Sequence, residues 1–348
     1  MPYTTINKST DHFNTKTYSG TGSAQSITGV GFRPDWLWIK HREDVSNHKL
    51  HDAIRTSTKV IGSNETSAEA TVAQGVTSFD SDGFSLGTDA SVNATGAKGI
   101  VAWNWKANGS GSANTDGSIN TTVSANTTAG FSIITYTGTG SAGTIGHGLG
   151  VKPSAWHVKA RSETRAWYGW HNSLALGDKI TLNESGAKTT DTSLFGTNAP
   201  TNQVINLGSS VGVNNNGVTF VCYAFAEIPG YSKFGSYIGN GQSGDNGKFI
   251  YTGFRPAYVM TKKTSGTGDW MIRDNRRYGY NGKWGDLYAN TNGAEGVNDS
   301  NTQSDLLSNG FKLRMSHTNH NENGGSYIYY AFAEAPLVGS NNVPAMAR

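Results

Sequence analysis

An internal threefold repeat is the feature of this sequence that most limits its fold. In each copy an aromatic residue opens a Gly-x-Gly turn, and a proline further along is followed by an apolar, mostly aromatic run. Self-similarity of this kind indicates one supersecondary unit built several times. The turns are residues 18–22, 136–140 and 237–241, and the runs that contain the proline are residues 31–40, 150–159 and 253–262.

The copies stay in register beyond the proline. Asp52, His171 and Asp274 each stand 18 residues after the proline of their own copy. Each copy then closes on an aromatic strand, at residues 101–105, 221–225 and 328–332. The second copy departs from the other two because it has His171 where they have aspartate. The repeat therefore spans whole units of about 100 residues.

Composition favours β-structure within each unit. The chain has 45 glycines, 11% aromatic residues and only 15% charged residues, which is typical of short strands joined by turns. In Trp36-Leu37-Trp38 the large rings recur at every second position, so they lie on one face of a strand, where we expect a second sheet. We expect the strands at 36–40 and 101–105 to be central and adjacent. The predicted fold is all-β, with three tandem β-sandwich units of jelly-roll type and an N-terminal arm.

Turn-rich and apolar-poor stretches place the boundaries. A flexible connector sets the first unit apart, whereas the second and third units abut. We expect the first unit to lie near the docking arm and the other two to form the presented end. The predicted segments are a docking arm at 1–17, units at 18–107, 130–229 and 230–337, a Gly/Ser/Asn/Thr-rich connector at 108–129 and a C-terminal tail at 338–348.

Charge and cysteine content argue against several classes of protein. A net charge of +3 without runs of like charge does not indicate nucleic-acid binding. The single Cys222, within an apolar strand, is predicted to be a buried residue, and one cysteine gives no intrachain disulfide. No stretch approaches 18 apolar residues, so we expect no membrane insertion.

The candidate catalytic and metal-binding groups have simpler structural interpretations. Glu227 and Glu334 resemble a glycosidase pair, but they hold the same position in different copies, which favours solvated carboxylates. His317 and His320 lack a third ligand at zinc spacing and fit a polar hairpin tip. His48 and His51 are interpreted in the same way. We therefore predict no catalytic residue, no metal site, no cofactor and no enzyme activity.

One aromatic cluster is a candidate for recognition. Trp167, Tyr168 and Trp170 fall within four residues, and strand alternation cannot bury all three rings on one face. At least one ring is expected at the surface, where it could stack on a sugar of a host glycan. The alternative is that these rings belong to the core and to a subunit interface.

Several segments resemble a known family of repeats. Residues 3–9 and 13–18, the block at 31–40, Ser78 to Phe84 and the closing Tyr330-Ala331-Phe332-Ala333-Glu334-Ala335-Pro336 are similar to a repeat family of virion appendage and tail-fibre-type proteins of marine tailed bacteriophages. The resemblance covers nearly the whole chain and implies no catalytic residues. The chain has no coiled-coil heptads and no collagen-like run, which favours a short appendage over a long fibre.

These observations lead to an expected role on the exterior of a phage particle. The chain is expected to be a tail fibre or short appendage for host attachment that binds other virion proteins through its N-terminal arm. A homotrimer would bury the surplus of aromatic residues. The alternatives are a capsid decoration protein, a carbohydrate-binding module that reads host surface glycans and, third, a polysaccharide depolymerase.

Overall fold

Nearly all regular structure in the protein is antiparallel β-sheet. The computed structural model describes residues 4–281, 285–297 and 303–338. Within them the helices are single short turns that precede or connect strands. The all-β, sandwich-type prediction is therefore confirmed. None of the helices in these ranges has the length and apolar character that crossing a bilayer requires.

The strands fall into three consecutive groups, here called units 1, 2 and 3. Unit 1 contains η1 (Ser9–Asp11), β1 (Phe13–Ser19), β2 (Gln25–Thr28), β3 (Trp36–His41), β4 (Lys49–Asp52), β5 (Thr56–Ile61), β6 (Ala70–Thr71), β7 (Val76–Asp80), β8 (Gly83–Leu86), α1 (Ala90–Asn93) and β9 (Gly99–Trp105). Unit 2 contains β10 (Ser112–Asn114), β11 (Thr121–Asn126), β12 (Phe131–Thr137), β13 (Gly143–Gly146), β14 (Ala155–Ala160), β15 (Tyr168–His171), β16 (Asp178–Thr181), β17 (Thr189–Thr190), α2 (Thr192–Phe195), β18 (Val204–Leu207), α3 (Val211–Asn214) and β19 (Thr219–Phe225). Unit 3 contains β20 (Ser232–Ile238), η2 (Gly244–Asn246), β21 (Phe249–Tyr251), β22 (Phe254–Lys263), β23 (Met271–Asp274), β24 (Gly285–Tyr288), β25 (Gly296–Val297), β26 (Ser304–Leu307), β27 (Gly310–Leu313) and β28 (Ser326–Pro336).

Each unit has a main sheet with the same strand order. The orders are β1-β9-β3-β4-β5-β6 in unit 1, β12-β19-β14-β15-β16-β17 in unit 2 and β20-β28-β22-β23-β24-β25 in unit 3. The predicted neighbours of the first copy are confirmed, because β3 pairs with β9 from Trp36 opposite Trp105 to His41 opposite Ile100. A smaller sheet accompanies each main sheet, with orders β2-β8-β7, β13-β18 and β21-β27-β26.

Both faces of the main sheets are buried, which explains their nearly continuous apolar sequences. In β3, Leu37 and Ile39 point to the small sheet and join a core of their own within unit 1. Trp36 and Trp38 point the other way, into a core shared by all three units. The expectation that these tryptophans face the second sheet of their own unit is therefore wrong, since that sheet packs on the intervening aliphatic residues.

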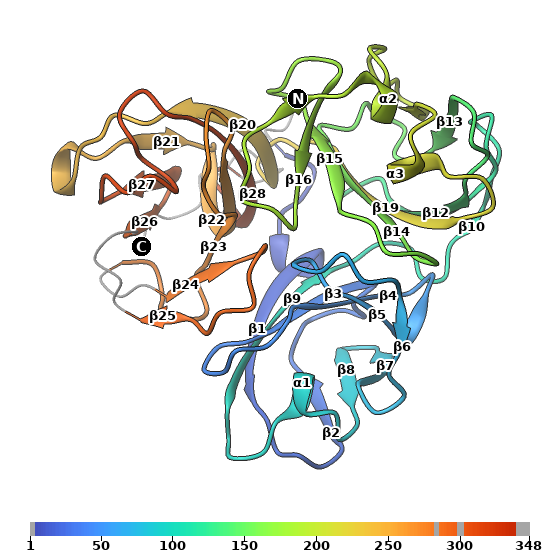
Figure 1. The fold of residues 1–348 in the computed structure, drawn as a ribbon. Coiled ribbons are helices and arrows are strands. Elements are labelled where there is room, and N and C mark those ends of the chain that lie inside the picture. Colours follow the sequence, from blue (N-terminus) through green and yellow to red (C-terminus); the bar gives the residue numbers. More distant parts are fainter. Residues whose placement is uncertain (1–3, 282–284, 298–302, 339–348) are drawn as a thin grey trace.

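The three units surround a common aromatic centre (Figure 1). The Trp36 ring of unit 1 lies 4.6 Å from the Tyr223 ring of unit 2, and the Trp105 ring lies 5.7 Å from Tyr258 of unit 3. Phe225 in turn lies 5.9 Å from Phe332. Unit 1 is thus not set apart from the other two. The aromatic surplus that suggested a homotrimer is buried inside a single chain.

Two segments that were expected to lie outside the units belong to the sheets. In the expected arm, Phe13 is 1% exposed and begins β1, which pairs along its whole length with β9. In the expected connector, β10 and β11 extend the main sheet of unit 2 through pairing with β12. Buried Ile119 and Val123 anchor this hairpin, which a turn-rich composition conceals. Most of the expected tail, residues 339–348, lies outside the described residues.

A buried asparagine holds each Gly-x-Gly turn. The side-chain Oδ1 atoms of Asn93, Asn214 and Asn321 accept hydrogen bonds from the backbone N–H of the residue between the two glycines, at 2.8, 2.8 and 3.0 Å. The second glycine of each turn has a positive φ, which a residue with a Cβ adopts only with strain. The aromatic-Gly-x-Gly signature therefore indicates a turn that is hydrogen-bonded to the segment before the last strand of its unit.

Candidate functional site at the seams between the units

The contacts between neighbouring units, here called seams 1–2, 2–3 and 3–1, repeat the same backbone bridge. Each bridge consists of two N–H groups that donate to carbonyls of the neighbouring unit. Across seam 1–2, Arg165 N donates to Thr66 O and Glu69 N donates to Arg161 O. Across seam 2–3, the pairs are Gly268 N to Ser185 O and Lys188 N to Thr264 O, and across seam 3–1 they are Ser46 N to Asn292 O and Glu295 N to Arg42 O. All six N···O distances lie between 2.6 and 3.2 Å. The repeats therefore associate head to tail and close a ring.

A ring nitrogen crosses each seam at one equivalent position. His48, Trp167 and Trp270 each stand 14 residues after the proline of their copy. Since His48 Nδ1 accepts a hydrogen bond from Trp38, its Nε2 carries the proton and donates across the seam. The acceptors are the carbonyls of Tyr288, Gly62 and Thr181, at 3.0, 2.8 and 2.9 Å.

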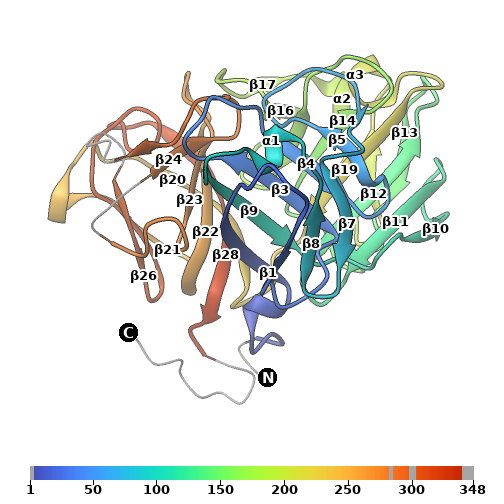
Figure 2. The same cartoon turned by 90° about the horizontal axis from the view of Figure 1, so that it is seen from below.

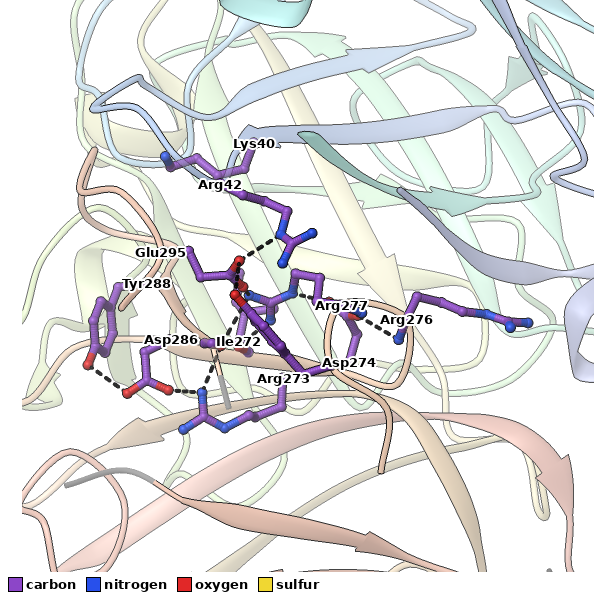
Figure 3. Close-up of polar contacts among 12 residues, drawn as sticks. Lys40, Arg42, Ile272, Arg273, Asp274, Arg276, Arg277, Asp286, Tyr288 and Glu295 are labelled. Carbon is purple, nitrogen blue, oxygen red and sulfur yellow. Dashed lines mark hydrogen bonds and ion pairs between the residues drawn. The ribbon is translucent and has the colours of Figure 1, made fainter. Parts of the chain in front are cut away.

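Seam 3–1 contains a buried network of charged side chains (Figure 3). Arg277 Nε donates to Asp274 Oδ2 at 2.6 Å, and Arg277 also pairs with Glu295. From unit 1, Trp103 Nε1 donates to Asp274 Oδ2 at 2.9 Å and Arg42 Nε donates to Glu295 Oε2 at 2.6 Å. Burial opposes the charge of Arg277, but the two carboxylates outweigh burial and raise its pKa. Arg277 therefore stays charged, and the network joins two units.

Seam 1–2 repeats this network with the equivalent residues. Arg55 pairs with Asp52 and with Glu69, and the Tyr223 hydroxyl of unit 2 donates to Asp52 Oδ2 at 2.7 Å. Arg161 of unit 2 forms a bidentate pair with Glu69, at 2.9 and 3.0 Å. Burial again opposes the charge of Arg55, and Asp52, the Tyr223 hydroxyl and Glu69 together raise its pKa.

Seam 2–3 has neutral residues where the other two have an aspartate and an arginine. His171 and Leu174 take these positions, and the His171 ring lies 5.2 Å from Tyr330 of unit 3. Burial lowers the pKa of His171 to about 4, so the imidazole is neutral at pH 7. Lys188 replaces the glutamate and pairs with Asp178 of its own unit at 2.6 Å. Seam 2–3 is therefore aromatic at these positions, whereas the other two seams are ionic.

Three equivalent lysines are buried beside the seams. Lys40, Lys159 and Lys262 stand six residues after their prolines and are at most 1% exposed. Burial lowers the pKa of each ammonium group to about 8. Lys159 Nζ donates to Thr66 O at 2.9 Å across seam 1–2, and Lys262 Nζ donates to Ser185 O at 3.0 Å across seam 2–3.

A cavity of about 20 Å³ lies at the centre, where rings from the three units meet. His157 lines it together with Tyr223 and Tyr330, and Trp38 and Met260 occupy the positions equivalent to His157 in the other units. Neither ring nitrogen of His157 has a hydrogen-bond partner among the described residues. Burial lowers the pKa of His157 to about 3, which keeps it neutral.

The predicted glycan patch is mostly inside the protein. Trp167 is fully buried, and its ring nitrogen donates a hydrogen bond across seam 1–2. Trp170 is 4% exposed and stacks on Trp156 at 4.7 Å. Only Tyr168 is half-buried, with Lys179 Nζ 5.1 Å from its ring centroid. The two tryptophans thus belong to the core, and the interpretation of this cluster as an exposed stacking surface is wrong.

The structure also places the other candidate residues. Glu227 accepts from the backbone N–H of Phe234, whereas Glu334 of unit 3 pairs with Tyr280 and lies 3.7 Å from an arginine of the same unit. Cys222 is buried as predicted, and burial raises the pKa of its thiol. Within the described ranges, no three His, Cys, Asp or Glu side chains are grouped so that they could hold a metal ion.

The remaining predicted histidines are structural. His51 is 1% exposed, and its Nδ1 atom lies 2.6 Å from the carbonyl of Ser57. His317 and His320 have stacked rings with centroids 6.3 Å apart, and burial lowers the pKa of His320 well below its usual range. The equivalence of His48 with Trp167 and Trp270 was missed at the sequence level, although alignment of the copies on their prolines reveals it.

Comparison with known proteins gives a match to a family model. A family model described as a domain of unknown function (DUF7483) matches residues 8–336, which include all three units. No curated protein and no solved structure matches the chain.

Proposed function

The chain belongs to the DUF7483 family, a domain of unknown function, and we propose that it is a non-catalytic attachment protein on the exterior of a tailed bacteriophage particle. In this proposal the three units form one rigid knob. The seams serve as structural joints, since their charged groups are buried and bonded to one another. The resemblance of the repeat to virion appendage proteins supports the phage assignment.

The position of the chain ends is the observation that carries the proposal. η1 and the last strand, β28, contact each other (Figure 2). The Phe13 and Phe332 rings stack with their centroids 5.4 Å apart. Since β1 runs from Phe13 to the first Gly-x-Gly turn, that turn lies at the opposite pole. A knob of this kind can be mounted by this pole while it presents the outer faces of its units and the opposite pole.

This geometry changes the expected way of docking. Residues 13–17 of the expected arm are part of β1, so the proposed docking surface is the pole formed by η1 and the end of β28. A homotrimer would have to use the outer surfaces of the units, because the aromatic rings are already buried within one chain. The proposed trimer assembles on the particle through these outer surfaces, and light scattering of the protein tests its formation.

Immunogold electron microscopy of purified phage particles, with antibodies raised against this chain, tests the proposal. We expect gold at the tail or at a short appendage. Labelling distributed over the head instead would support the second candidate, a capsid decoration protein, which the same one-pole geometry suits. Absence of the chain from purified particles, measured by mass spectrometry, would refute both.

A further inference from the structure

Two aromatic side chains are exposed side by side on the outer face of unit 3. Phe249 is 40% exposed and Tyr251 is 51% exposed, whereas Ile250 between them is buried in the core of the unit. Because side chains alternate along a strand, both rings lie on the outer face of β21. Large exposed apolar groups that lie together, unlike scattered ones, indicate a contact surface.

The fold itself does not require these rings. The strands equivalent to β21 also carry a buried isoleucine that pairs with the next strand of the small sheet, namely Ile27 in unit 1 and Ile145 in unit 2. The residues that flank these isoleucines are small: Ser26 and Thr28 in unit 1, and Thr144 and Gly146 in unit 2. Two of three copies thus fold without aromatic residues here, so the pair is an addition specific to unit 3.

The edge of one ring reaches the neighbouring strand. Gly310 of β27 is paired with Tyr251, and a Cβ atom on Gly310 would lie 2.1 Å from the carbonyl oxygen of Ile250 and 3.1 Å from Cε2 of Phe249. The close backbone approach already requires glycine at this position, and one edge of the Phe249 ring lies close to it.

Two ammonium groups border the rings. Lys312 is paired directly with Phe249 on the same face, and its Nζ donates to the carbonyl of Asp245 at 2.8 Å. Lys233 Nζ lies 6.0 Å from the centroid of the Tyr251 ring. An ammonium group has three donors, so each lysine can bond to a further acceptor.

We propose that the aromatic platform formed by Phe249 and Tyr251, with Lys233 and Lys312 at its border, binds an acidic saccharide of the host surface. The ring faces pack against the C–H faces of the sugar rings, and the ammonium groups pair with carboxylate or sulfate groups. A protein partner would need about 800 Å² of contact surface on each side, which two rings do not supply. This inference rests on the proposed attachment function and identifies its ligand class.

The test replaces the platform with the residues of unit 1. The double variant Phe249→Ser/Tyr251→Thr copies Ser26 and Thr28, which the same fold already accommodates. Binding is measured by biolayer interferometry to immobilised hexasaccharides of glucose, of guluronate and of sulfated galactose. We expect the parent protein to prefer an acidic hexasaccharide, and the double variant to bind it at least 10-fold more weakly with an unchanged melting temperature.

Two further variants make the result specific. Val45→Ser removes an apolar side chain that is 71% exposed on unit 1 and should leave binding unchanged. Lys233→Gln combined with Lys312→Gln should abolish the preference for acidic over neutral hexasaccharides. The proposal is overturned if no hexasaccharide binds, if the neutral one is preferred, if the double variant binds like the parent, or if the platform captures a purified virion protein instead. Gold labelling of the particle decides the attachment function separately.

Discussion

Replacing Arg277 by leucine tests whether the ionic network at seam 3–1 holds units 3 and 1 together. Arg277 is 1% exposed, and its partner Asp274 is fully buried. Without the guanidinium, the Asp274 carboxylate stays in the interior with only neutral donors, among them Trp103 Nε1. Removal of one partner from a buried ion pair typically lowers the free energy of unfolding by about 3–5 kcal/mol.

The melting temperature shows how much of the chain unfolds together. At about 2.1 cal/mol/K per residue, cooperative unfolding of the whole chain carries an entropy of about 0.7 kcal/mol/K. A loss of about 4 kcal/mol then lowers the melting temperature by about 5–6 °C. If unit 3 unfolded alone, the entropy would be about a third as large and the shift about 16 °C. Differential scanning fluorimetry distinguishes these two shifts.

Unit 2 supplies the rescuing variant. Asp274→His combined with Arg277→Leu copies His171 and Leu174 of seam 2–3 and removes the buried charge together with its partner. Glu295 keeps its bond to an arginine of unit 1. We expect this double variant to recover more than half of the stability lost in Arg277→Leu.

The neighbouring arginine is the matched control. Arg276 is exposed, and in Figure 3 its side chain points away from the network. Arg276→Leu should change the free energy of unfolding by no more than about 0.5 kcal/mol. The reasoning fails if Arg277→Leu lowers the melting temperature by no more than this control does, or if the double variant is no better than the single one.

Four other substitutions test three separate parts of the account. His157, with a folded pKa of about 3, stays neutral while the unfolded chain takes up a proton below pH 6.5, so stability falls as the pH drops from 6.5 towards 3. His157→Met, which copies Met260, should reduce the drop in the free energy of unfolding between pH 7 and pH 4.5 by about 2–3 kcal/mol, measured by urea titration. An equal drop in both proteins would contradict this. Asn214→Ala removes the amide that holds the second Gly-x-Gly turn and should lower the free energy of unfolding by about 2–4 kcal/mol in the same assay. A decrease under about 1 kcal/mol would show that the turn is stable without this amide. Gly83→Ala would place a Cβ 1.8 Å from a backbone oxygen and should lower the free energy of unfolding by more than about 3 kcal/mol. Gly186 has open space around it, so Gly186→Ala should leave this free energy nearly unchanged. Equal effects of the two variants would contradict the packing argument.

The sequence predicted the local structure well because the repeat and the strand period are local signals. The register that aligned Asp52, His171 and Asp274 corresponds to equivalent positions in the three main sheets. The direction in which Trp36 and Trp38 face was predicted wrongly. A period of two identifies two faces of a strand, but it does not show whether each face meets its own unit or another unit.

The site was harder to predict because it is built from residues of different copies. The offset shared by Asp52 and Asp274 was visible, but their partners Tyr223 and Trp103 lie 171 residues away along the chain. The aromatic cluster at Trp167 was predicted to be partly exposed because its rings are close in sequence, although their burial depends on the neighbouring unit. The exposed pair on β21 could have been found by asking where one copy alone carries aromatic residues.

The most direct test of the closed ring is differential scanning calorimetry of the intact chain. Since the shared core and the seams join all three units, they should unfold in one transition whose calorimetric and van't Hoff enthalpies agree, with a ratio of about 1. Three units that fold independently would give separate transitions, or one broad transition with a ratio of about 3. That second result would contradict the central claim that the repeats form one body.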